Sequence, residues 1–105
     1  MLNASRRRTL RQIAHHLDPV VSVGNNGVSP AVLTELERAL KDHELIKVKI
    51  HQNARDERQA VINALSVASP CELVQTIGKI VVLYRANPDA DPALSNVLRS
   101  GLKLS

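Results

Sequence analysis

Aromatic side chains are almost absent from this chain of 105 residues, which has no phenylalanine or tryptophan and one tyrosine, Tyr84. Proteins that read single-stranded RNA through RRM or OB folds stack bases on aromatic rings. This chain has almost no aromatic side chains for that mode of recognition. A nucleic-acid partner would therefore have to be held mainly through its backbone, by charge and by shape.

Cysteine is scarce as well, because Cys71 stands alone and excludes an internal disulfide. A reduced thiol suits the cytosol, and we expect Cys71 to be a small apolar filler. No apolar run approaches the roughly 18 residues of a membrane span. No apolar stretch typical of a signal peptide follows the basic N-terminus. We therefore expect a cytoplasmic, monomeric protein without membrane contact.

Negative charge is missing from the first segment. Residues 1–17 carry four arginines and no acid, whereas the rest of the chain balances ten basic against ten acidic side chains. The net charge of +4 therefore lies at the N-terminus, where it could meet a polyanion. The alternative is an arginine cluster that only improves solubility.

The arginine-rich segment predicts a first helix, from Ser5 as N-cap to about His16. Apolar residues recur there at helical spacing and form one stripe: Leu10, Ile13, Ala14 and Leu17. Positions three and four apart are neighbours on a helix, so Arg7, Arg8 and Arg11 are expected to lie together on the outer face.

Two strands enclose the second predicted helix. The β-branched run Val20–Val23 predicts a short buried strand. Ser29 as N-cap and Pro30 as first residue begin a helix that ends near His43. Residues Glu44–Ile50 then alternate, which is typical of a half-exposed strand. Its buried face takes Ile46, Val48 and Ile50, and its open face takes Lys47 and Lys49.

A third helix and a hairpin follow. Asn53 is expected to cap this helix, which ends before Pro70. Its inward residues are expected to be Val61, Ala64, Leu65 and Ala68. Glycine comes first in the pair Gly78-Lys79, which suits a type II′ turn between strands at residues 72–77 and 80–85.

These elements predict one α/β domain over residues 1–85, in the order α-β-α-β-α-β-β. A helix between the first two strands favours a parallel crossover, and the tight turn makes the last two antiparallel. We therefore expect a mixed four-stranded sheet packed by helices. Residues 86–105 show only weak periodicity, and we expect a mobile C-terminal tail with one short helix around Pro92–Leu98.

The loop Gly24-Asn25-Asn26-Gly27 runs into the Ser-Pro helix start. Free backbone N–H groups beside the positive end of a helix dipole make an anion site, and glycine lets a phosphate approach closely. A P-loop and a Rossmann fingerprint are excluded, because no lysine follows Gly27 and no third glycine has the right spacing. A turn without a ligand is the alternative, since one G-x-x-G is a weak motif.

Two segments place this loop in a wider context. VGNNGVSPAVLTELERALKDHELIKVKI (residues 23–50) and QTIGKIVVLYR (residues 75–85) resemble the hallmark segments of the bacterial YhbY family, whose domain is also called the CRM (chloroplast RNA splicing and ribosome maturation) domain. The resemblance covers about Ser5 to Arg85. It implies a fold related to the C-terminal domain of translation initiation factor three. It also implies a non-enzymatic protein that binds ribosomal RNA of the large-subunit precursor.

In the resembled family, the G-x-x-G loop is compared with the KH-domain loop that clamps nucleotide backbone. That role carries over to Gly24, Asn25, Asn26 and Gly27, although many relatives place a basic residue within this loop. We expect further RNA backbone contacts from Arg7, Arg8, Arg11, Lys47, Lys49, Lys79 and Arg85. Such contacts position RNA rather than read bases. The lysines could equally be solvated, and Arg85 could pair with an acid.

We expect no enzymatic activity, no metal site and no cofactor. The adjacent His15 and His16 do not face one ligand point on a helix. No set of nucleophile, base and orienting group can be assembled from the sequence. The main alternative function is a protein-interaction module that docks on a ribosomal protein or assembly factor through the exposed strand face or the tail.

Overall fold

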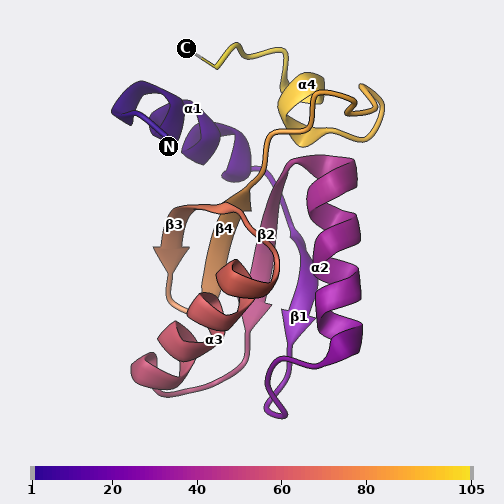
Figure 1. The fold of residues 1–105 in the computed structure, drawn as a ribbon. Helices are drawn as coiled ribbons and strands as arrows, with labels where there is room; N and C mark the ends of the chain where they lie inside the picture. The colour runs from indigo at the N-terminus through magenta and orange to yellow at the C-terminus, as the bar shows by residue number, and fades with distance from the viewer. Residues whose placement is uncertain (1, 105) are drawn as a thin grey trace.

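A twisted four-stranded sheet organises the computed structural model, which describes residues 2–104 (Figure 1). Its elements are α1 (Ala4–Ala14), β1 (Pro19–Val23), α2 (Pro30–His43), β2 (Leu45–Ile50), α3 (Arg55–Ala68), β3 (Glu72–Ile77), β4 (Ile80–Tyr84) and α4 (Asn96–Ser100). The strand order is β1-β2-β4-β3, with β1 parallel to β2 and the other neighbours antiparallel. The predicted α/β class and mixed sheet are confirmed.

Helix boundaries follow local capping chemistry. The Ser29 hydroxyl accepts the Val32 N–H at 3.2 Å, so α2 begins as predicted. The prediction of Ser5 as the cap of α1 is wrong, because the Asn3 side chain accepts the Arg6 N–H at 2.7 Å. Asn53 does not cap α3 either. The N-cap is Ala54, which has no side-chain acceptor to offer.

The turn between β3 and β4 has the predicted chemistry. Gly78 has a φ of +55°, whereas Lys79 does not have a positive φ. A positive φ at the first central residue alone identifies the type II′ class, whose twist matches that of the flanking strands. The tight turn therefore pairs β3 with β4 along most of their length.

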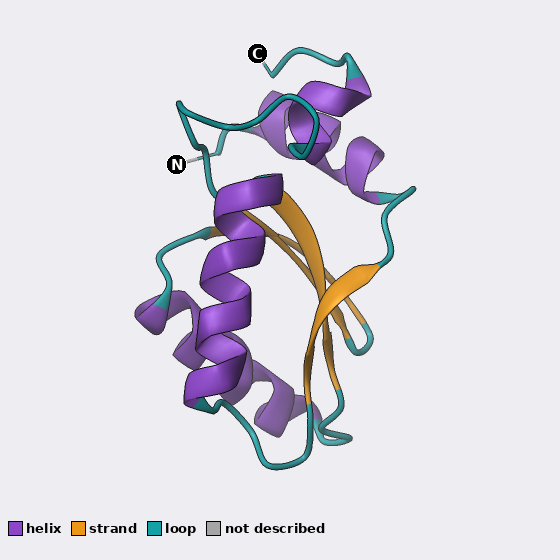
Figure 2. Ribbon diagram, turned by 90° about the vertical axis from the view of Figure 1, so that its right-hand side faces the viewer, coloured by secondary structure: helices purple, strands orange, loops and turns teal. Residues whose placement is uncertain are grey.

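Helices α2 and α3 cover one face of the sheet, as Figure 2 shows in side view. The apolar cluster between these layers includes Val23 of β1, Leu36 of α2, Val48 of β2 and Leu65 of α3. In α3 the buried residues are Val61, Ile62 and Leu65. The prediction that Ala64 and Ala68 point inward is wrong, since both are exposed.

The opposite face is covered only at one end, by α1 and α4 (Figure 2). Leu10 and Ile13 of α1 pack there on Leu45, Val82 and Tyr84. Among residues 2–104, no helix covers the remainder of this face, on which Lys47 is half-buried and Lys49 exposed, as the alternation in β2 predicts. This uncovered part of the sheet is referred to below as the open face.

The segment after Arg85 folds back over the start of β2. Its helix α4 buries Val97 in the cluster beneath α1. The Asn87 side chain donates to the Lys41 carbonyl at 2.9 Å, and His43 Nδ1 lies 2.9 Å from the Leu94 carbonyl. The domain boundary at residue 85 and the mobility of the tail stay predictions. Among residues 2–104, no helix is long and apolar enough to cross a membrane.

Candidate functional site

The Gly24–Gly27 loop forms one exposed turn at the carboxyl end of β1. The Gly27 N–H donates to the Gly24 carbonyl at 3.0 Å, which places Asn25 and Asn26 at the corners. Gly27 has a φ of +80°, which favours glycine, whereas the φ of Gly24 is not positive. A Cβ at either glycine would meet no atom within 4 Å, so the loop is open to an approaching ligand.

The backbone N–H groups without acceptors in this turn belong to the loop more than to the helix. Within the described residues, no acceptor meets the backbone N–H of Asn25, Asn26 or Val28. In the first turn of α2, Pro30 has no N–H and Val32 donates to Ser29. The helix start therefore offers fewer free donors than expected from the sequence.

One end of the sheet gathers three loops that are distant in sequence. Here β1 and β2 end and the β3–β4 turn lies beside them, opposite to α1 and α4 (Figure 1). The His51 N–H donates to the Val23 carbonyl at 3.0 Å, and the Ile50 N–H donates to the Lys79 carbonyl at 2.7 Å. The Lys79 ammonium donates to Asn53 Oδ1 at 2.7 Å, so this predicted contact residue also braces the loop end.

Arg8 and Arg11 of α1 meet Lys47 of β2 around an open hollow of about 570 Å³. The hollow is completed by Gln12, Ala14, His15, His16, Gln75 and Ile77. None of these lining residues is acidic, and within residues 2–104 no carboxylate pairs with the three cations. This set is called the basic hollow below. It leads onto the open face, where Lys49 follows on the same side of β2.

The other two predicted arginines make internal contacts. Arg7 donates to the carbonyls of Leu73 and Val74, at the bulge of edge strand β3. Arg85 forms a two-point ion pair with Glu37 and donates through Nε to the Pro70 carbonyl at 2.8 Å. Arg7 therefore does not share one outer face with Arg8 and Arg11, because it turns toward the edge of the sheet.

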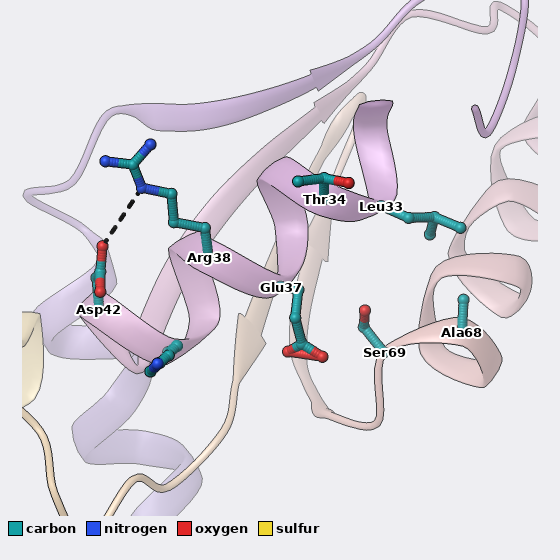
Figure 3. A pocket seen from close by; sticks show the side chains of 8 residues that line it. Leu33, Thr34, Glu37, Arg38, Asp42, Ala68 and Ser69 are labelled. Atoms are coloured by element: carbon teal, nitrogen blue, oxygen red, sulfur yellow. Dashed lines mark ion pairs between the residues drawn. The ribbon is translucent and has the colours of Figure 1, made fainter. Parts of the chain in front are cut away.

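A second hollow, of about 760 Å³, lies between α2 and α3 on the covered side of the sheet (Figure 3). Its lining includes Glu37 and Asp42 as well as Arg38 and Lys41, and Arg38 pairs with Asp42 at 3.8 Å. The charges balance, and the Glu37 carboxylate is taken by Arg85. A hollow with balanced charges attracts a polyanion less than the basic hollow does.

The tyrosine is buried and the cysteine is half-buried. Tyr84 packs under α1, and burial, followed by the Glu44 carboxylate, raises the pKa of its phenol. Burial also raises the pKa of the Cys71 thiol, which packs against the core as a filler. Neither ring stacking by Tyr84 nor a reactive thiol fits these environments. No cluster of three metal-ligating side chains occurs among the described residues.

The comparisons with known proteins agree with this architecture. The family model of the CRS1 / YhbY (CRM) domain matches residues 2–85. A protein of Pseudomonas aeruginosa named "Probable RNA-binding protein PA4753" is 47% identical over 98 residues, which cover 93% of this chain and 94% of that protein. An "RNA-binding protein" of Haemophilus influenzae is 46% identical over 89 residues, covering 85% and 90%.

A solved structure is similar as well. The solution structure of SAV1595 from Staphylococcus aureus, described as a hypothetical protein and a candidate for RNA binding, superposes with a TM-score of 0.74. Its sequence is 36% identical, and the match covers 85% of this chain and 93% of that one.

Proposed function

The chain belongs to the CRS1 / YhbY (CRM) domain family, and from that premise we propose that it binds RNA without catalysing a reaction. The relatives from Pseudomonas aeruginosa and Haemophilus influenzae carry RNA-binding names, which supports this class of partner. We further propose that the RNA is ribosomal RNA of the large-subunit precursor and that the protein acts in the cytoplasm during assembly of that subunit.

The basic hollow is the observation that carries the proposal. Three cations from two elements converge there with no acid among the lining residues. Phosphates are the RNA groups that such a site favours, because charge-assisted hydrogen bonds to arginine are strong and often bidentate. The hollow between α2 and α3 supplies the contrast, since its acids and bases balance.

The proposed path of the RNA backbone begins in the basic hollow. It continues over Lys49 on the open face and ends at the Gly24–Gly27 loop, with Lys79 beside it. This path follows β2, whose six residues span about 20 Å. Free amides of the loop would hold one phosphate, and the lysines and arginines would hold its neighbours. Such contacts fix the position of the RNA and read little of its sequence.

Salt dependence tests the mechanism. If Arg8, Arg11, Lys47 and Lys49 each neutralise one phosphate, the slope of log affinity against log salt is about −2.8 to −3.6. Fluorescence anisotropy with a structured fragment of large-subunit ribosomal RNA measures this slope. A slope near zero would contradict backbone binding through these residues.

Two double variants, each lacking two positive charges, test whether the position of the charge matters. The double variant Arg8→Ala/Arg11→Ala should bind more weakly and lose about 1.4 to 1.8 units of slope. Arg38→Ala/Lys41→Ala removes the same charge from the opposite side of the sheet, and it should change RNA affinity and the salt slope little. Equal losses in the two variants would show that only net charge matters, and the basic hollow would then not be the site.

A further inference from the structure

Gln52 is the second residue after the end of β2 and is only 7% exposed. Its side-chain amide nitrogen donates to the Gly24 carbonyl at 2.8 Å. The same carbonyl accepts the Gly27 N–H that closes the exposed turn. Gln52 therefore holds, from inside the protein, the acceptor on which the shape of the Gly24–Gly27 loop depends.

The other polar atom of this side chain is unsatisfied. Within the described residues, Gln52 Oε1 is buried without a hydrogen-bond partner. Exchanging the two ends of the amide would not remove the problem, because Oε1 would then face the Gly24 carbonyl, and two acceptors cannot form a hydrogen bond. A buried acceptor without a partner lowers stability, and an apolar side chain of the same size would avoid that cost. The amide at this position is therefore better explained by its contact with Gly24 than by the needs of the core.

Gln52 is itself fixed by rigid elements. Arg58 of α3 donates to the carbonyl of Gln52 at 3.2 Å and to that of Asn53 at 2.6 Å. The neighbouring His51 N–H is bound to β1, and Lys79 of the β3–β4 turn binds the Asn53 side chain. The residue that reaches the loop thus projects from a segment attached to three parts of the fold.

We propose that Gln52 is a positioning residue for RNA binding, which keeps the Gly24–Gly27 turn in the shape that presents the amides of Asn25 and Asn26 to a phosphate. This inference rests on the proposed function. Two of the four loop residues are glycines, whose backbone loses the most freedom on ordering. A loop held in its binding shape before the RNA arrives does not lose that freedom on association, so affinity is higher.

Replacement by an apolar side chain of similar size is the test. Gln52→Met removes the donor and also the unsatisfied oxygen, so thermal stability should be unchanged or higher. Amide exchange at Gly27 should accelerate, and affinity for the ribosomal RNA fragment should fall about tenfold. Gln59→Met makes the same substitution on the exposed side of α3 and should leave exchange at Gly27 and RNA affinity unchanged.

A double-mutant cycle separates positioning from general damage. In a Gly24→Asp background the contact between the loop and RNA is already lost. Gln52→Met should therefore reduce RNA affinity much less in that background than in the unsubstituted protein. With Arg8→Ala/Arg11→Ala the losses should add, because the two sites are separate. Additive losses in the Gly24→Asp background would overturn the positioning role.

Other outcomes distinguish the inference from the function on which it rests. A folded Gln52→Met protein with full RNA affinity, measured beside a weakened Arg8→Ala/Arg11→Ala variant, overturns the inference and leaves the proposed function standing. Absence of RNA binding by the unsubstituted protein overturns both. Should Gln52→Met fail to fold, exchange of the Gln52 side-chain amide protons in the unsubstituted protein decides. Slow exchange supports the contact, and exchange at the rate of a free amide overturns it.

Discussion

Ser95 donates its hydroxyl proton to the Glu44 carboxylate at 2.6 Å, and both residues are buried. The second oxygen of Glu44 accepts the Asn87 N–H at 2.8 Å. Ser95 also accepts the Leu98 N–H at 3.2 Å and thereby caps α4. A single carboxylate at the start of β2 therefore ties two points of the C-terminal segment to the sheet.

Loss of the Ser95 hydroxyl should destabilise the whole domain. Ser95→Ala removes the cap of α4 and leaves a buried carboxylate oxygen without its donor, and we expect a loss of about 2 kcal/mol or more in the free energy of unfolding. Urea denaturation measures this loss. Ser100→Ala removes the hydroxyl of an exposed serine in the same helix, whose partners are the backbone groups of Val97 and Leu102, and should cost less because no buried carboxylate loses a donor. A Ser95→Ala variant with an almost unchanged free energy of unfolding would instead favour the mobile tail expected from the sequence. Slow amide exchange at Val97 would argue against a mobile tail.

Gly24 offers a cleaner test of phosphate approach than Gly27. Its φ is not positive and a Cβ would meet open space, so substitution should preserve the fold. Gly24→Asp places a carboxylate where RNA is proposed to approach, and affinity should fall about tenfold or more. Gly24→Asn has nearly the same shape without the charge and should cost much less. Equal affinities of both folded variants for the ribosomal RNA fragment would exclude phosphate binding at this loop.

The Arg85–Glu37 ion pair predicts a small effect of Arg85 on RNA binding. The guanidinium is already held by Glu37 and by the Pro70 carbonyl. Arg85→Ala should lower stability by about 0.2–1 kcal/mol for the partly exposed pair. Its effect on RNA affinity should be smaller than that of Lys49→Ala, because within the described residues no carboxylate pairs with Lys49 on the open face. Equal affinity losses would support the direct RNA contact that the sequence suggests for Arg85.

Tyr84 should titrate at higher pH in the folded protein than in the unfolded chain. Burial and the Glu44 carboxylate both disfavour the phenolate, so they raise its pKa. The contribution to stability is complete below the unfolded pKa of about 10 and is lost as the pH rises through the folded pKa. Phenolate absorbance reports this residue alone, because the chain has no other tyrosine and no tryptophan. Coincident titration curves with and without urea would contradict the buried position.

The sequence by itself determined those features whose cause is local. Ser29 and Pro30 satisfy and shape the first turn of α2, so its start could be predicted from two residues. Alternation placed Lys47 and Lys49 opposite to the buried face of β2, because successive side chains of a strand point to opposite sides. Gly78 determined the turn type, because it supplies the positive φ at the first central position. The family resemblance rests on the same local segments and is confirmed over residues 2–85.

Only the tertiary structure decided which of the predicted contact residues share a surface. The spacing of Arg7, Arg8 and Arg11 places them on one helix but cannot say how that helix rotates against the sheet. Packing of α1 sends Arg7 to the edge of β3 and leaves Arg8 and Arg11 beside Lys47. In the same way, the orientation of α3 is set by the sheet beneath it, which buries Ile62 rather than Ala64.

Gln52 gives no signal in the sequence at all. It is one polar residue in a short loop, and its contact with Gly24 spans 28 positions of the chain. Pairs so distant meet only because β1 and β2 run parallel and end side by side, which brings the loops after them together. Local propensity and side-chain periodicity describe neighbours along the chain. The surface proposed to meet RNA depends on neighbours in space, which sheet pairing and helix packing create.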